Sequence, residues 1–209
     1  MHGNNIIKNI QNERGIVMAS FMDKLKNKAQ QAVKETIKDA VQSAGNKSEK
    51  IVFDALPANI EEFKNLTQAA MDTPFKTAAM TVLAFTYYPV DKEMSLAMLD
   101  FLKGPRPLTP MEKQFIADRF MDKDYVPRSY FEGATPANDY EPAEPYTIIV
   151  SENPYSYQNE GYAILYMTSG GADNPRSVQL RKAKDGKWYL WEQYLLADIR
   201  QPESANPWA

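Results

Sequence analysis

The sequence predicts an α+β protein: an N-terminal amphipathic helix, a block of helices, and a C-terminal four-stranded antiparallel sheet. Three observations support this prediction. Apolar residues recur with a helical period over 20–44, four helix-start signals follow one another over 59–112, and residues after 146 alternate as strands do. Runs of helices followed by runs of strands are typical of helices packed on an antiparallel sheet.

The composition suits one domain of ordinary size with an appendage, because 44% of the 209 residues are hydrophobic and 24% are charged. There is no cysteine, and the only histidine is His2. Disulfides, thiol or imidazole catalysis, and zinc sites built on Cys or His are therefore excluded, and we expect no cofactor. The apolar runs are too short to cross a bilayer, and no secretion signal follows either early methionine. We expect a cytoplasmic protein, peripheral at the inner face of the membrane if the N-terminal helix binds lipid.

The segment Glu13-Arg14-Gly15 indicates where translation starts. Its codons can form a purine-rich run, and two residues then separate it from Met18. This is how a bacterial ribosome-binding site looks when it is read as protein. We therefore expect Met18 to be the start and residues 1–17 to be a leader that plays no part in the fold.

Residues 18–47 are predicted to form the amphipathic helix, over 20–44, and a linker that includes Gly45 to Ser48. The residues expected to face a membrane or a partner are Met22, Leu25, Lys26, Val33, Ile37 and Val41. Residues 18–50 carry seven lysines and four acids, whereas residues 51–209 carry 15 basic and 22 acidic residues. A basic helix on an acidic body favours an anionic membrane surface or a protein partner, self-association included. Docking of the helix on its own domain is the third interpretation.

Residues 51–209 are predicted to be one α+β domain whose four helices begin at recognisable caps. Asn59, Thr73, Asp91 and Thr109 each precede a helical pattern, and proline follows Thr73 and Thr109 at the first helical position. The first helix is expected to reach about Ala70. Gly104-Pro105 should end the third helix.

The second half of this domain is expected to hold a proline-rich ordered connector, residues 124–145, and then the sheet. The four strands are predicted at 146–150, 162–168, 176–182 and 188–192, with Asp185-Gly186 as the turn of a hairpin. SGGADNPR is predicted to be a tight turn in which Gly170 and Gly171 permit positive φ. The predicted order of elements, with helices first and a closing sheet that ends in DGKWYLWEQ, is similar to the order in cone-shaped NTF2-like folds.

Several long segments carry a family resemblance. They are FLKGPRPLTP (101–110), DYVPRSYFEGATP (124–136), EPYTIIVSENPYSYQNEGYA (144–163), SGGADNPR (169–176) and GKWYLWEQYLLADIRQP (186–202). With the helix start SFMDKLK at 20–26, they resemble an uncharacterised domain-of-unknown-function family of Gram-positive gut bacteria of the Firmicutes or Clostridia type. The resemblance implies a bacterial protein that begins at Met18 and supplies no catalytic residue.

Tyrosines and arginines of the connector and strands form the candidate recognition surface. Ten of the twelve tyrosines lie between residues 125 and 194. The candidates for contact with a peptide or a sugar are Arg128, Tyr130, Phe131, Tyr140, Tyr155, Tyr157 and Arg176. The alternative interpretation is that these tyrosines have no ligand and only pack in a half-buried sheet. Arg128, Arg176, Arg181 and Arg200 can form an anion pocket, although pairing with nearby acids is expected instead.

The sequence thus predicts a non-catalytic bacterial binding or adaptor protein, recruited to a membrane surface or a partner by its N-terminal helix. The acidic body argues against nucleic-acid binding. The alternative is a hydrolase-type enzyme with carboxylate or tyrosine chemistry in a pocket between helices and sheet.

Overall fold

The structure is a computed structural model, and it describes residues 47–208. These residues belong to one compact unit, Gly45–Ala209. The predictions for the leader 1–17 and for the helix 20–44, with its expected contact residues, lie outside the described residues.

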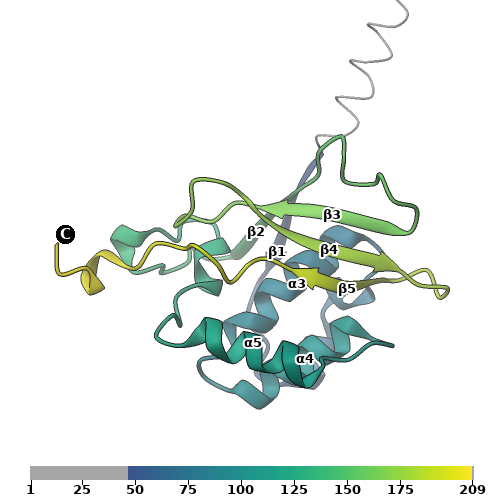
Figure 1. The fold of residues 1–209 in the computed structure, drawn as a ribbon, viewed down its shortest axis with the longest axis horizontal. Coiled ribbons are helices and arrows are strands. Elements are labelled where there is room, and N and C mark those ends of the chain that lie inside the picture. Colours follow the sequence, from purple (N-terminus) through teal and green to yellow (C-terminus); the bar gives the residue numbers. More distant parts are fainter. Residues whose placement is uncertain (1–46, 209) are drawn as a thin grey trace, which may run out of the picture. The chain divides into compact units, whose positions relative to one another are not determined.

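Within residues 47–208 the fold is α+β, as predicted, with four helices and a five-stranded antiparallel sheet (Figure 1). The strands follow the chain in the order β1-β2-β3-β4-β5. Their bounds are β1 Ser48–Phe53, β2 Tyr146–Ser151, β3 Tyr162–Met167, β4 Arg176–Lys182 and β5 Trp188–Gln193. Gly186, in the β4–β5 hairpin, has φ +84°, as expected for the predicted turn.

The prediction of four strands was wrong by one, because β1 precedes the helices. Its register with β2 runs from Ser48↔Ser151 to Phe53↔Tyr146. The polar start of β1 was interpreted as a linker, and no local pattern marks a strand whose partner lies about a hundred residues away. β1 nevertheless contributes two side chains to the core, since Phe53 is 1% exposed and Ile51 is buried.

The four predicted helix starts are confirmed. The helices are α2 Ile60–Asn65, α3 Pro74–Thr86, α4 Lys92–Lys103 and α5 Pro110–Phe120, and the side chains of Asn59, Thr73, Asp91 and Thr109 accept backbone hydrogen bonds at their first turns. α2 is shorter than expected, because Leu66 adopts an extended conformation. A 3₁₀ turn, Thr67–Ala70, continues the chain to Ala70.

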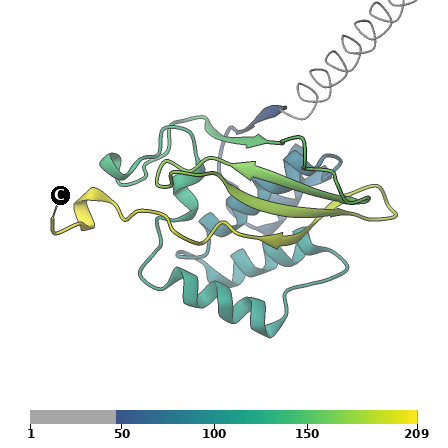
Figure 2. The same ribbon diagram turned by 45° about the horizontal axis from the view of Figure 1, so that its top comes forward.

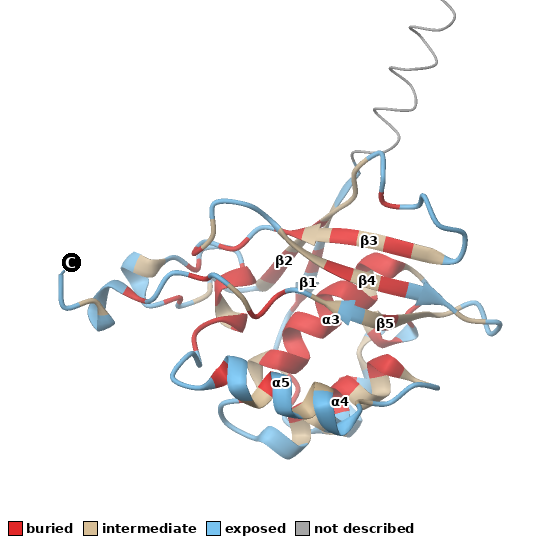
Figure 3. Cartoon of the chain, in the orientation of Figure 1, coloured by how far each residue is buried: buried red, intermediate tan, exposed pale blue. Residues whose placement is uncertain are grey.

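Helix α3 forms the centre of the described domain. It lies against the inner face of the sheet, and α4 packs on α3 and on the edge strand β5 (Figures 1 and 2). Eleven of the thirteen residues of α3 are buried. Along β3, buried positions alternate with half-buried ones (Figure 3). Phe120 of α5 stacks on Tyr88 just after α3, with ring centres 4.3 Å apart. One face of the sheet is therefore core, and the opposite face is accessible.

The predicted connector, residues 124–145, is ordered and contains two 3₁₀ turns, Pro127–Tyr130 and Pro136–Asn138. The prediction of positive φ at Gly170 and Gly171 was wrong. Both glycines instead allow close packing: a Cβ on Gly170 would lie 2.0 Å from the Ala134 carbonyl oxygen, and one on Gly171 would lie 2.1 Å from the Tyr140 hydroxyl. In the described part of the chain, none of the helices has the length and apolar character needed to cross a membrane.

Candidate functional site

Three of the predicted recognition residues are part of the core. Tyr130, Phe131 and Tyr140 are 3%, 3% and 0% exposed. The Tyr130 hydroxyl donates to the Leu195 carbonyl at 2.6 Å, and the Tyr140 hydroxyl donates to the Arg200 carbonyl at 2.7 Å. These tyrosines hold the segment after β5 against the connector and cannot contact a ligand at the surface.

The other four predicted residues lie on three different segments of the chain. Tyr155 and Tyr157 are exposed in the loop between β2 and β3, where the Tyr157 hydroxyl donates to Glu152. The Arg176 guanidinium donates to the carbonyls of Asn174, Ala197 and Asp198, and so holds the segment after β5 against the start of β4. Arg128 lies 3.9 Å from Asp124. Of the seven predicted residues, three are therefore in the core, and Arg176 is hydrogen-bonded to backbone carbonyls.

A different group of side chains forms a basic cleft of about 390 Å³ beside the edge strand β5. Its cationic members come from two places, the end of α4 with the following loop and the end of β4 with its turn. The cleft is lined by Lys103, Arg106, Arg181, Lys182, Lys184, Tyr189 and Trp191, together with Pro105, Ala183 and Leu190, and by no acidic residue.

A β-bulge in β5 places Trp191 in this cleft. The register passes from Leu180↔Leu190 to Gln179↔Glu192, so Trp191 has no direct partner on β4. Its carbonyl accepts instead from the buried Lys103 Nζ at 3.3 Å. Bulges commonly redirect a side chain in this way. Leu190 points to the core, and Trp191 joins Tyr162 of β3 in an edge-to-face pair with ring centres 5.8 Å apart.

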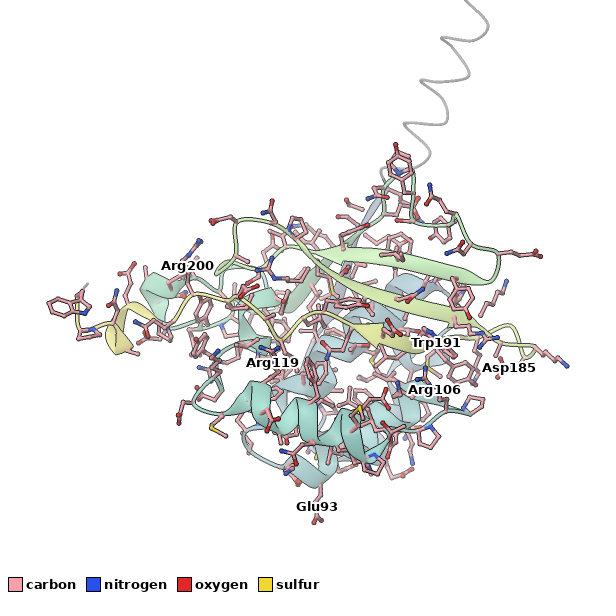
Figure 4. The ribbon with its side chains drawn as sticks, in the orientation of Figure 1. Glu93, Arg106, Arg119, Asp185, Trp191 and Arg200 are labelled. Carbon is pink, nitrogen blue, oxygen red and sulfur yellow. The ribbon has the colours of Figure 1, made fainter. Side chains whose placement is uncertain are left out.

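The loop after α4 brings Arg106 to Trp191. Gly104 ends the helix with φ +55°, and a Cβ at this position would lie 2.2 Å from the Tyr189 ring. Only glycine therefore lets the loop pass this close to β5. Pro105 and Pro107 restrict the backbone on both sides of Arg106. Figure 4 shows Arg106 reaching from this loop toward Trp191.

Two guanidinium groups lie against the Trp191 ring. The Cζ of Arg106 is 4.4 Å from the ring centre and that of Arg181 is 4.6 Å from it. Arg181 is also 5.3 Å from the Tyr162 ring. Such cation–π contacts hold the planar groups in place without using their N–H donors. The donors thus stay available for an oxyanion, which a guanidinium binds through two parallel hydrogen bonds.

The charges of this cleft are not neutralised by the domain. Within residues 47–208, ion pairs of 4.0 Å or less involve none of Arg106, Arg181, Lys182 and Lys184. Arg200, by contrast, pairs with Asp173 at 2.6 Å, as expected of a surface arginine. Unpaired cations gathered in a concave site attract anions.

Among the cationic residues of the cleft, Lys103 is the exception, because it is buried and forms an ion pair. Its side chain is 2% exposed, and its Nζ lies 2.8 Å from Glu112 Oε1. Burial alone raises the pKa of the Glu112 carboxyl, but hydrogen bonds from Lys103 and Thr109, with the Lys103 charge, lower it to about 2. Glu112 also caps α5 through the Thr109 backbone N–H. This pair fixes α5 to the end of α4.

An apolar cleft of about 370 Å³ adjoins the basic cleft and lies between α5 and β5. The two share Lys103, Arg106, Leu190 and Trp191. Most of its other residues are apolar: Phe85, Leu99, Leu108, Met111, Phe115 and Ile116. Its two carboxylates already have partners, since Glu112 binds Lys103 and Glu192 accepts from the Tyr194 hydroxyl.

Sequence reasoning missed most of this site. Of its residues only Arg181 was considered for an anion pocket, and Lys103, Arg106 and Trp191 were not. One local signal was available: the basic run Arg181, Lys182 and Lys184 directly before the tryptophans of β5. No sequence signal connects this run with Arg106, because a bulge and a loop far apart in the chain bring them together.

The comparisons with known proteins identify a family. The sequence pattern described as Domain of unknown function (DUF6935) matches residues 55–203, which is more than half of the chain. No curated protein and no solved structure matches the chain. The match includes the residues of both clefts and omits β1.

Proposed function

The chain belongs to the DUF6935 family, a domain of unknown function, and we propose that it is a non-catalytic binding protein that holds an oxyanion in its basic cleft. The observation that carries this proposal is the set of four cations that have no ion-pair partner within residues 47–208, two of them against the Trp191 ring. A volume of about 390 Å³ is in the range of small-molecule sites. A phosphate or carboxylate group satisfies the free guanidinium donors.

Binding is favoured over the hydrolase alternative by the titratable groups of the two clefts. The hydrogen bond to Asp185 and burial raise the pKa of Tyr189 to about 12, and Glu112 has a pKa of about 2. Neither pKa lies near neutral pH, where a general acid or base is most efficient. In residues 47–208 no group of three or more His, Cys, Asp or Glu residues is placed to hold a metal ion, and the hydrolase alternative does not depend on one.

Recruitment by the N-terminal helix remains part of the proposal and rests on sequence alone. Residues 20–44 are basic and amphipathic, and they bind an anionic membrane surface or a protein partner, a second copy included. Flotation of residues 18–209 and 48–209 with anionic vesicles at low salt tests the membrane form. Equal flotation of the two chains would exclude it.

The oxyanion site is tested by calorimetric titration with pyrophosphate at low ionic strength. Arg106→Gln and Arg181→Gln each remove one guanidinium from Trp191, and we expect each to weaken binding about tenfold or more. Lys123→Gln is the matched control. It makes the same change in net charge with an exposed lysine after the far end of α5 and should leave the affinity within about twofold.

Two results would contradict the proposed function. One is a wild-type chain that does not bind pyrophosphate. The other is an equal loss in Lys123→Gln and in the arginine variants, because binding would then depend on net charge and not on this cleft.

A further inference from the structure

We propose that the two clefts together bind one amphiphilic anion, with its charged head in the basic cleft and its apolar tail in the apolar cleft. This inference rests on the proposed function and adds the class of ligand. It starts from the contiguity of the clefts, which share Arg106 and Trp191 at their border. A molecule whose head meets Arg106 can extend directly along α5.

The apolar cleft presents hydrophobic side chains to solvent. Met111 is 82% exposed and Phe115 is 44% exposed, and the two lie one helical turn apart on α5. Tyr194, 56% exposed, lines the β5 side. Apolar side chains that gather around a groove are typical of a binding site, whereas scattered ones need no explanation. A tail laid between α5 and β5 would remove this surface from water.

The charges of the two clefts fix the orientation of the ligand. The apolar cleft has two carboxylates, Glu112 and Glu192, beside Lys103 and Arg106, so its charges balance and it offers no excess of positive charge to an anionic head. The basic cleft contains only cations among its charged residues. The head therefore lies beside Arg106 and Arg181, and the tail lies beside Leu108 and Phe115.

A peptide that extends the sheet along β5 is a poorer fit. The outer edge of this strand is already occupied: the Trp188 N–H donates to the Met71 carbonyl at 2.8 Å, and the Trp188 carbonyl accepts from Thr77 Oγ1 at 2.7 Å. The Trp191 carbonyl accepts from Lys103. An added strand has no continuous row of free backbone groups to pair with. The groove instead offers side chains, which suit a flexible tail.

The test compares inorganic phosphate with butyl, hexyl and octyl phosphate as monomers, below the concentrations at which they form micelles. We expect wild-type affinity to rise with each added methylene, by at most about fourfold, the value for full burial. Phe115→Ser and Met111→Ser should flatten this rise by removing apolar cleft surface, with unchanged affinity for inorganic phosphate. Val90→Ser, which alters an 87% exposed residue after α3, should leave the rise intact.

The possible results separate this inference from the proposed function. Phosphate binding that depends on Arg106, with no gain from longer chains, would overturn the amphiphile and leave the oxyanion site standing. A gain with chain length that survives both Phe115→Ser and Met111→Ser would place the tail elsewhere and also overturn it. Binding to vesicles that contain phosphatidic acid, without a gain for monomeric alkyl phosphates, would assign the surface to membranes instead.

Discussion

At the scale of single residues, the ion pair Lys103–Glu112 holds together the elements that form the basic cleft. A buried ammonium group is costly unless it is paired and hydrogen-bonded. Lys103 meets this condition with Glu112 at 2.8 Å and the Trp191 carbonyl at 3.3 Å. The Trp191 ring in turn contacts the guanidinium groups of Arg106 and Arg181. The Lys103–Glu112 pair therefore supports, through Trp191, the position of both arginines.

The pKa of Glu112 gives a pH-dependent prediction. Its folded value of about 2 is lower than the unfolded value of about 4.3, so its contribution to stability is present above about pH 4.3. That contribution is lost as the pH falls toward 2. We expect Glu112→Gln to lower the free energy of unfolding at pH 7 by about 1.5–3 kcal/mol, because Lys103 loses its hydrogen bond to a charged partner. Urea unfolding of both proteins between pH 2 and 7 measures this difference.

The difference should shrink as the pH falls, because protonation of Glu112 removes the same interaction in the wild type. A difference that stays constant down to pH 2 would contradict the assigned pairing. Lys103→Met combined with Glu112→Gln should cost less than the sum of the two single changes.

At the scale of elements, the helices were predictable and the first strand was not. A capping side chain and a proline at the first helical position are local signals, so the starts at Asn59, Thr73, Asp91 and Thr109 could be predicted from short windows. β1 is a strand because of its pairing with β2, which is distant in sequence. The boundary at residue 51 consequently falls inside β1.

Truncation at β1 tests this account of the domain. We expect residues 48–209 to unfold cooperatively, whereas residues 54–209 should lose several kcal/mol of stability. The shorter chain lacks Ile51 and Phe53 from the core and leaves β2 with an unpaired edge. Chemical unfolding of the two chains measures the loss. Equal stability would show that β1 is not integral to the sheet.

The candidate site shows the same limit of sequence reasoning. The sequence shows the tyrosines of the connector, but it does not show to which backbone carbonyls their hydroxyls donate. Tyr130 and Tyr140 donate to Leu195 and Arg200, more than fifty positions away, and are buried for that reason. Trp191 was equally visible within a predicted strand, but its direction depends on a bulge that the sequence pattern does not mark.

At the scale of the whole molecule, the described domain combines an acidic body with a local concentration of positive charge. Residues 51–209 carry 15 basic and 22 acidic residues, yet four of the basic ones line a single cleft without ion-pair partners. The net charge therefore does not predict the sign of this surface. The uneven charge distribution predicts an anionic membrane or a protein partner for the N-terminal helix and gives no indication of this cleft.

The most direct test of the central claim is fluorescence of Trp191 during a pyrophosphate titration. The chain has three tryptophans, so Trp188→Phe and Trp208→Phe leave Trp191 as the only one. An anion that binds Arg106 and Arg181 changes the charges against this ring. We predict a saturable change in emission that is lost when Arg106→Gln and Arg181→Gln are added together. A flat titration, or an identical change in the protein without both arginines, would contradict an oxyanion site in the basic cleft.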